Sequence, residues 1–323
     1  MNVIFWGSNE LSLPFLKHLC NNNFVKLNSV ITIPDKPQDR GLKLKPSLVK
    51  IFAKENSIKC LTPDRLDDKE FFRTLEGMSP DVSFVVSYGK IIPQNIIQLH
   101  KIGMLNIHFS LLPKYRGAAP IQWALLNGEK ETGVTIFWID KNLDTGDIFL
   151  QEKVSVSIDD DYYILSKKLI DLGLKLLDCA INNLINNNIL RVKQQGTPTY
   201  CYLIKKEHGR INWNDTAEKI HNKVRAFVHW PKAYTQLQIF SLNKVINVKI
   251  LKTQIFNNEE FKLKLNEQVQ YGNIVKIYKD FLLVYCGEQT YLKILKIQPE
   301  NRKELNIKDF VCGYRIKEFD RFI

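Results

Sequence analysis

The chain has 323 residues and a net charge of +12, with 45% hydrophobic and 25% charged residues. This length allows two ordinary domains, and the composition is that of a soluble globular protein with a sizeable core. No apolar run is long enough to span a bilayer, and none of the six cysteines forms a C-x-x-C pair, which leaves zinc and thioredoxin-like chemistry without support. Scattered cysteines and an N-terminus without signal-peptide features predict a cytoplasmic protein.

The first half of the chain alternates strand-like and helix-like stretches. The predicted strands are 2–6, 25–33, 82–87, 104–109 and 134–139, and the predicted helices are 11–19, 47–55, 120–126 and 161–181. Such alternation is typical of βαβ units, and strands that are buried on both faces of a parallel sheet read as continuous apolar runs. We therefore expect an α/β domain with a Rossmann-like, mainly parallel sheet over residues 1–206.

A different pattern follows the polar stretch 194–209. After a predicted helix at 216–227, the segments 234–240, 245–255, 269–278, 281–286 and 291–297 are strand-like, and several alternate polar and apolar residues. Five short strands predict a small OB-like β-barrel over residues 207–323, together with its linking helix.

Most of the positive charge lies in this second part. Residues 201–323 hold 22 lysines and arginines against 13 aspartates and glutamates, whereas residues 1–200 hold 24 against 21. A basic domain favours a polyanionic partner, either a nucleic acid or a membrane surface, although a merely solvated basic surface would look the same.

Polar residues lie at or just after the carboxyl ends of two of the predicted strands. Asn106 and His108 are two residues apart, so their side chains share one face of a strand, and Asp144 follows the next strand. Open α/β sheets bind ligands outside the carboxyl ends of their strands, so an amide, an imidazole and a carboxylate could meet at one edge. The same residues could also be satisfied polar groups and a turn aspartate. Neither G-x-G-x-x-G nor a P-loop motif occurs.

The segment that carries these residues resembles the signature of the folate-dependent formyltransferase family throughout. It runs from Asn106 to Ile148 and reads NIHFSLLPKYRGAAPIQWALLNGEKETGVTIFWIDKNLDTGDI. Residues 32–47 are similar to a mobile loop of that family, 85–89 to the strand and turn beside the pterin ring, and 210–213, 225–227 and 230–231 to the junction with a C-terminal barrel.

The resemblance implies roles for individual residues. Asn106, His108 and Asp144 would be the catalytic trio. The residues expected to contact the folate are Ser110, Leu111, Leu112, Pro113, Tyr88, Gly89 and Ile92. Arg40 and Lys43 of the mobile loop would engage tRNA. The co-substrate would be 10-formyltetrahydrofolate, no metal would be needed, and the acceptor would be the amine of methionyl initiator tRNA, with no obligate protein partner and no membrane.

Other functions remain open at this point. A member of the family that acts on a small amine, such as a sugar nucleotide or glycinamide ribonucleotide, or a hydrolase of formyltetrahydrofolate, would share the trio but would have little use for a basic barrel. A non-catalytic RNA-binding protein would not need an intact trio. The chain departs from the family pattern at Phe109, at the first turn Gly7-Ser8-Asn9 and at Asp39 in the mobile loop.

Overall fold

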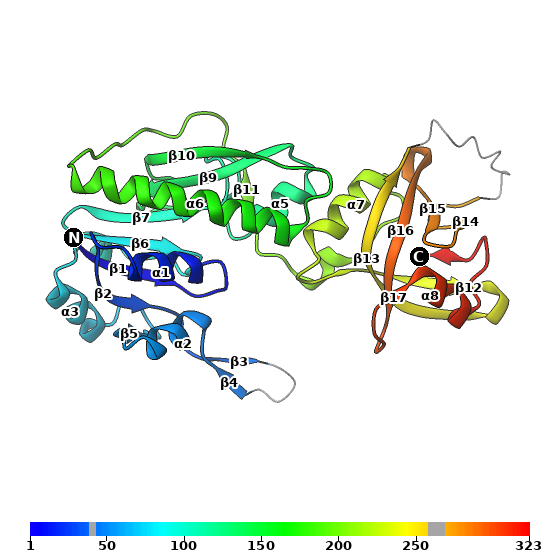
Figure 1. The fold of residues 1–323 in the computed structure, drawn as a ribbon, viewed down its shortest axis with the longest axis horizontal. Helices are drawn as coiled ribbons and strands as arrows, with labels where there is room; N and C mark the ends of the chain where they lie inside the picture. The colour runs from blue at the N-terminus through cyan, green and yellow to red at the C-terminus, as the bar shows by residue number, and fades with distance from the viewer. Residues whose placement is uncertain (39–42, 258–268) are drawn as a thin grey trace. The chain divides into compact units, whose positions relative to one another are not determined.

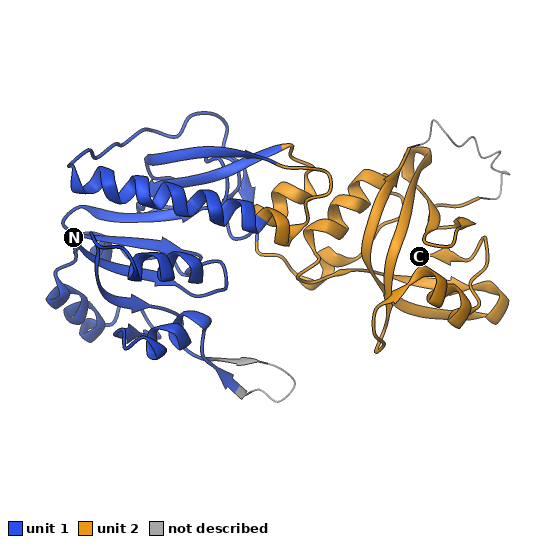
Figure 2. Cartoon of the chain, viewed as in Figure 1, with its two compact units in different colours: residues 1–120, 131–155, 166–202 blue, residues 121–130, 156–165, 203–323 orange. Residues whose placement is uncertain are grey.

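The computed structural model describes residues 1–38, 43–257 and 269–323, in two compact units (Figures 1 and 2). Unit 1 comprises residues 1–120, 131–155 and 166–202, and unit 2 comprises residues 121–130, 156–165 and 203–323. Two segments of the first half therefore belong to unit 2. The domain boundary expected at residues 206 and 207 stays a prediction.

Unit 1 is built on a seven-stranded sheet with the order β10-β9-β7-β6-β1-β2-β5. The strands are β1 (Asn2–Gly7), β2 (Lys26–Ile31), β5 (Cys60–Leu61), β6 (Val82–Val86), β7 (Gly103–His108), β9 (Glu131–Trp138) and β10 (Ile148–Ser155). The strands from β7 to β5 run parallel, whereas β9 is antiparallel to both of its neighbours. The expected mainly parallel, Rossmann-like sheet is confirmed.

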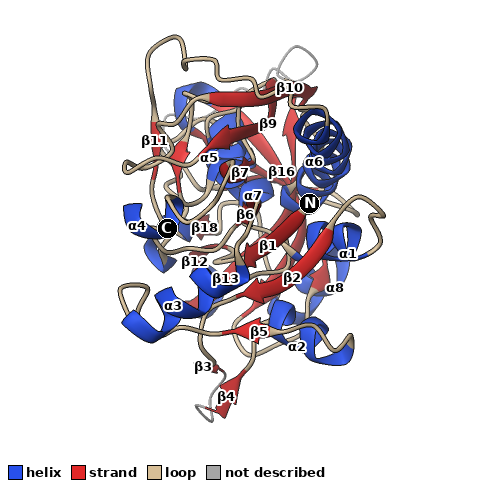
Figure 3. Ribbon diagram, turned by 90° about the vertical axis from the view of Figure 1, so that its left-hand side faces the viewer, coloured by secondary structure: helices blue, strands red, loops and turns tan. Residues whose placement is uncertain are grey.

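Helices cover both faces of this sheet (Figure 3). They are α1 (Leu13–Cys20), α2 (Leu48–Glu55), α3 (Lys69–Met78), α4 (Gln94–Ile97) and α6 (Tyr162–Ile185), the last of which lies in unit 1 from Ser166 onward. On one face, Phe71 of α3 and Ile96 of α4 pack with Trp6 of β1. On the other face α6 packs closely against α1, since a Cβ on Gly173 would lie 2.8 Å from the ring of Phe15 in α1. Each large side chain buried in this way contributes about 1.5–3 kcal/mol to folding.

Two small ladders lie beside the main sheet. The antiparallel pair β3 (Lys36–Gln38) and β4 (Lys43–Lys45) flanks the undescribed residues 39–42. The parallel pair β8 (Arg116–Gly117) and β11 (Tyr200–Cys201) ties the segment after β7 to the segment after α6. A Cβ on Gly117, whose φ is +121°, would meet the Cys201 carbonyl oxygen at 2.2 Å, so only glycine fits this ladder.

Unit 2 contains a nearly closed antiparallel barrel with the strand order β14-β15-β16-β13-β12-β18. The elements are α5 (Pro120–Leu126), α7 (Ala217–Ala226), β12 (Ala233–Ile239), β13 (Lys244–Phe256), β14 (Ile274–Ile277), β15 (Leu282–Cys286), β16 (Thr290–Pro299), β17 (Leu305–Asn306), α8 (Ile307–Tyr314) and β18 (Arg321–Phe322). The last strand pairs with β12, and its Arg321 also forms a bridge with Asn273, just before β14. These contacts bring the two ends of the sheet together, and the expected OB-like barrel is confirmed.

One expected barrel strand begins later than its apolar pattern suggests. The pattern favours a strand from residue 269, but β14 starts at Ile274. Gly272 has a φ of +88°, and a Cβ there would lie 2.0 Å from the Phe322 carbonyl oxygen. The chain turns at this glycine so that β18 can approach.

No helix in the described part of the chain is both long and apolar enough to cross a membrane.

Candidate active site

Strand β7 carries the first two residues of the expected trio. Asn106 is half-buried, and His108, at the end of the strand, is 6% exposed. The Nε2 atom of His108 lies 2.8 Å from the Tyr115 carbonyl oxygen. Because a carbonyl oxygen only accepts hydrogen bonds, Nε2 must carry a proton, which makes Nδ1 the nitrogen that can exchange one. Among the described residues, the Asn106 side chain has no hydrogen-bond partner, so its amide can still donate.

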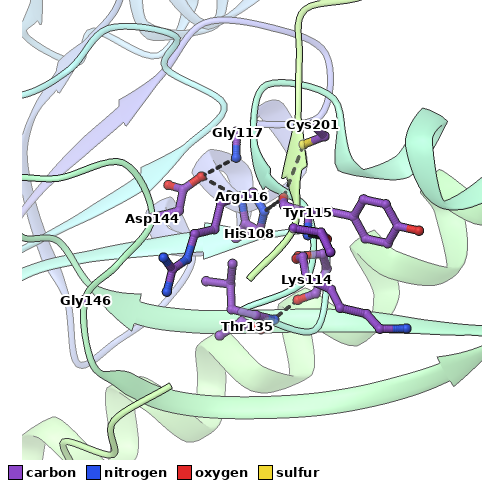
Figure 4. Close-up of polar contacts among 12 residues, drawn as sticks. His108, Lys114, Tyr115, Arg116, Gly117, Thr135, Asp144, Gly146 and Cys201 are labelled. Atoms are coloured by element: carbon purple, nitrogen blue, oxygen red, sulfur yellow. Dashed lines mark hydrogen bonds and ion pairs between the residues drawn. The ribbon is translucent and has the colours of Figure 1, made fainter. Parts of the chain in front are cut away.

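The carboxylate of Asp144 lies next to His108 (Figure 4). Its Oδ2 atom accepts a hydrogen bond of 2.7 Å from the Gly117 backbone N–H and is 3.8 Å from His108 Nδ1. The second distance is too long for a hydrogen bond, so the two side chains interact electrostatically across a short gap. Both are about nine-tenths buried, and little solvent screens this interaction.

Asp144 reaches this position by a route that differs from the expected one. The carboxyl ends of β7 and β9 do not meet at one edge, because β9 is antiparallel and its end, Trp138, lies opposite Leu105. The loop after β9 therefore runs back along β7 to bring its carboxylate to His108. The expected proximity is correct, but antiparallel pairing and a returning loop produce it.

Backbone conformation holds this loop in its path. Asp144 has a φ of 51°, a left-handed conformation that aspartate tolerates better than most residues. Two residues later, a Cβ on Gly146 would lie 1.6 Å from the Trp138 carbonyl oxygen. Only glycine allows this approach, which explains the Asp-x-Gly sequence in terms of geometry.

The expected folate segment, residues 110–113, is fastened by side chains from the neighbouring strands. Thr135 of β9 donates to the Ser110 carbonyl (2.6 Å) and accepts from the Leu112 N–H (3.1 Å). Gln151 of β10 donates to the Leu112 carbonyl (3.0 Å) and to Thr135 (2.8 Å). Ser110 and Leu112 are buried, whereas Leu111 and Pro113 are half-exposed. These hydrogen bonds therefore fix the backbone of residues 110–113 at the expected folate site.

The three other residues expected at the folate site differ in exposure. Gly89 is exposed, with a φ of +82° and open space around it. Tyr88 and Ile92 are buried, and the Tyr88 ring packs edge-on against Trp6 at 5.2 Å. Burial raises the pKa of Tyr88, whose hydroxyl group has no partner within the described residues. In this turn it is the backbone at Gly89 that is open to solvent.

The expected tRNA residues lie at the limit of the described structure. Arg40 is outside the described residues, and Lys43 begins β4. Sequence reasoning also missed residues that support the site, which are Arg116, Gly117, Thr135, Gln151 and Gln194. Their contacts depend on cross-strand register and loop return, for which the local sequence holds no signal. Within the described ranges, no cluster of three or more His, Cys, Asp or Glu side chains could hold a metal ion.

Comparisons with known proteins agree on one family. Residues 1–181 match the model described as formyl transferase, and residues 203–315 match the model described as formyl transferase, C-terminal domain. A methionyl-tRNA formyltransferase of Thermodesulfovibrio yellowstonii is 40% identical over 98% of this chain and 97% of its own length. One of Caldicellulosiruptor saccharolyticus is 40% identical over 99% of both chains.

Two solved structures of similar fold are formyltransferases crystallised with a folate derivative and a nucleotide or nucleotide sugar. WlaRD, a sugar 3N-formyl transferase crystallised with dTDP and 5-N-formyl-THF, is 26% identical, with a TM-score of 0.63 over 94% of this chain and 99% of its own. An N-formyltransferase of Helicobacter canadensis, in complex with folinic acid and dTDP-3-aminofucose, is 25% identical, with a TM-score of 0.61 over 91% of this chain and 98% of its own.

Proposed function

The chain belongs to the formyl transferase family, and on that premise we propose that it transfers the formyl group of 10-formyltetrahydrofolate to the amino group of methionyl initiator tRNA. The observation that carries this proposal is the 40% identity, over nearly the full length, with relatives named methionyl-tRNA formyltransferase. The product, formylmethionyl-tRNA, serves translation initiation, so we place the enzyme in the cytoplasm.

The reaction requires a donor at the formyl oxygen. The neutral amine attacks the formyl carbon, a C–N bond forms, and negative charge develops on the oxygen of a tetrahedral centre. Preorganised donors stabilise such a charge, and removing one typically costs on the order of a hundredfold in rate. The Asn106 amide fits this role because no described protein group uses its hydrogens.

His108 and Asp144 fit the proton transfers. As the intermediate collapses, the bond to N10 of the folate breaks, the amine loses a proton, and N10 gains one. With Nε2 held by the Tyr115 carbonyl, His108 would donate or accept through Nδ1. Asp144, 3.8 Å away, would stabilise the protonated ring and could receive the proton from the amine. General acid–base help of this kind contributes about 10²–10⁴-fold.

The folate would lie against the fastened backbone of residues 110–113. Thr135 of β9 and Gln151 of β10 hold that backbone by hydrogen bonds. The open turn at Gly89 offers further backbone groups for contact with the folate. We keep Tyr88 and Ile92 in the site as supports of this turn rather than as direct contacts, because both side chains are buried. The folate supplies the one-carbon unit, and the residues orient it.

The tRNA would be held by positive charge. Arg40 and Lys43 belong to a loop that is expected to engage the acceptor end, and the basic unit 2 would neutralise phosphates. Phosphate contacts position a nucleic acid but read little sequence. Selection of the initiator would therefore occur near the amine, not on the barrel.

A sugar nucleotide is the second candidate acceptor, because WlaRD and the Helicobacter canadensis enzyme match more than nine-tenths of the chain. The test is one assay in which 10-formyltetrahydrofolate is offered in parallel with methionyl initiator tRNA, a charged elongator tRNA and an amino-sugar nucleotide. We expect transfer to the initiator tRNA to dominate by kcat/KM. Preference for the sugar would establish the alternative, and formate release without any acceptor would indicate a hydrolase.

A further inference from the structure

A short, mostly exposed segment packs against the loop that carries Asp144. Residues 190–194, here called the strap, lie between α6 and β11. The Leu190 carbonyl accepts from the Trp138 ring N–H (2.8 Å), and Arg191 lies 4.1 Å from the centre of the Trp138 ring. Val192 pairs with Ile148, the first residue of β10. The strap thus contacts both ends of the loop between β9 and β10.

Gln194 ends the strap and differs from its surroundings. From residue 185 to residue 200, it is the only one that is not exposed. Its Nε2 atom donates to the backbone carbonyls of Asp144 and Gly146, both at 2.9 Å. Its Oε1 atom accepts from Nε (3.2 Å) and Nη2 (2.6 Å) of Arg116.

These four contacts saturate the amide. A glutamine side chain has two donor hydrogens and two acceptor lone pairs, and here each has a partner. The partners also fix the orientation of the amide, because carbonyls only accept and a guanidinium only donates. A glutamate at this position would keep the contact with Arg116 but would face two carbonyl oxygens without a hydrogen to donate.

The contacts connect the two parts of Asp144. Gln194 holds its backbone carbonyl, while Gly117, which follows Arg116 in β8, holds its carboxylate. Asp144 is therefore fixed from both sides by one assembly of strap and β8. The residue held in this way is the one with the left-handed backbone and the carboxylate 3.8 Å from His108 Nδ1.

We propose that Gln194 is a positioning residue for formyl transfer, which sets the Asp144 carboxylate against His108 through the two loop carbonyls. This inference rests on the function proposed above. The hydrogen bonds of Gln194 in the described structure go to Arg116, Asp144 and Gly146 and not to His108 or Asn106, so it acts through Asp144. A displacement of about 1 Å at a catalytic group can cost on the order of a hundredfold in rate.

The test compares Gln194→Glu and the uncharged Gln194→Met with Gln195→Glu. Gln195 is a matched control because it is the neighbouring, exposed glutamine and its side chain forms no hydrogen bond within the described structure. We expect both changes at residue 194 to lower kcat by about tenfold or more while each KM changes by less than about threefold, because binding residues are untouched. Gln195→Glu should behave as wild type.

A second measurement reports on position directly. The Gly117 N–H bonds to the Asp144 carboxylate, so its hydrogen exchange by NMR should accelerate in both Gln194 variants but not in Gln195→Glu. In an Asp144→Asn background, Gln194→Glu should add little further loss, since the two residues act as one unit.

The possible outcomes separate the two proposals. Wild-type kcat and unchanged Gly117 exchange in both Gln194 variants would overturn the role of Gln194 and leave the function standing if Asp144→Asn is still inactive. The role of Gln194 would also be overturned if thermal melting showed that the loss of kcat matches the fraction of unfolded protein. Near wild-type turnover of Asp144→Asn would instead remove Asp144 from the mechanism, and the role of Gln194 with it.

Discussion

Asn106 and His108 occupy the same face of β7 but are held differently. His108 is tied to the Tyr115 carbonyl, whereas the described structure gives the Asn106 amide no partner. A polar side chain without a protein partner contributes little to folding, and a net hydrogen bond contributes about 1 kcal/mol. The two residues should therefore separate function from stability.

We predict that Asn106→Ala lowers kcat on the order of a hundredfold or more, because a donor to the developing oxyanion is lost. Its unfolding free energy should equal that of wild type, while His108→Ala should lose about 1 kcal/mol in addition to its activity. Steady-state kinetics and urea unfolding of both variants measure these effects. An Asn106→Ala enzyme with normal turnover would exclude the amide from the mechanism.

The cysteine beside the site should be chemically inert. Cys201 donates to the Tyr115 carbonyl (3.2 Å), and burial raises the pKa of its thiol to about 11. Because the thiolate is the nucleophile, a raised pKa means less reactive thiolate at any pH below it. At pH 8 iodoacetamide should label exposed Cys179 and Cys312 and spare Cys201, and labelling of Cys201 should increase only towards pH 11. Peptide mass spectrometry reads this out, and early labelling of Cys201 would show that its site opens in solution.

At the scale of elements, the loop between β9 and β10 depends on one glycine. We predict that Gly146→Ala lowers kcat by about tenfold or more, because a Cβ at 1.6 Å from the Trp138 carbonyl forces the loop and Asp144 to move. Gly77→Ala in α3 is the matched control, since nothing lies within 4 Å of its Cβ position. A helical alanine should raise stability by roughly 0.5–1 kcal/mol and leave turnover unchanged. Equal turnover in the two variants would mean that the loop adapts without moving its carboxylate.

Most elements with a strong apolar pattern could be predicted from the sequence, but two elements were missed. Helix α5 has the predicted bounds, and α6 begins within one residue of its predicted start. Strand β10 was missed because an edge strand with exposed residues lacks an apolar run. Helix α3 was also missed, although Asp68 caps it and Phe71 and Leu75 face the core four residues apart.

The residues of the candidate site also fall into some that could be predicted from the sequence and some that could not. Residue types on one strand face are visible in the sequence, and Asn106 and His108 were found on that basis. We expected Asp144 near His108 because the carboxyl ends of parallel strands meet at one edge, but β9 is antiparallel to β7. The apolar pattern of a strand does not reveal its direction. Gln194 could not be found at all, since it contacts residues 50 positions earlier through backbone carbonyls that carry no sequence signal.

At the scale of the whole molecule, positive charge on the barrel is unevenly available. Of the lysines on barrel strands, Lys276 pairs with Glu318 and Lys296 pairs with Glu304. In β13, Lys249 and Lys252 are exposed and have no acidic partner within the described structure. Phosphates replace the mobile counter-ions around an unpaired lysine readily. They displace a carboxylate that is fixed to the protein less readily.

We predict that Lys249→Gln/Lys252→Gln weakens tRNA binding more than Lys276→Gln/Lys296→Gln, although both double variants remove the same charge. Each lost phosphate contact should lower the slope of log K against log salt by about 0.7–0.9, so the first variant should lose up to twice that amount and the second much less. Equilibrium binding of tRNA at several salt concentrations measures both slopes. Equal slopes would show that only the net charge of the barrel matters.

The antiparallel strand in the sheet of unit 1 has a consequence for synthesis of the chain. When translation has passed residue 130, the strands from β5 to β7 can already pair, but the outer edge of β7 lacks its partner. Open edges offer unpaired N–H and C=O groups to other chains. Residues 131–155 then add β9 and the largely exposed β10 as one hairpin, with the Asp144 loop at its tip. The same hairpin that brings the carboxylate to His108 thus replaces the buried edge of β7 with an edge strand, β10, whose exposed Glu152 and Lys153 disfavour pairing with other chains.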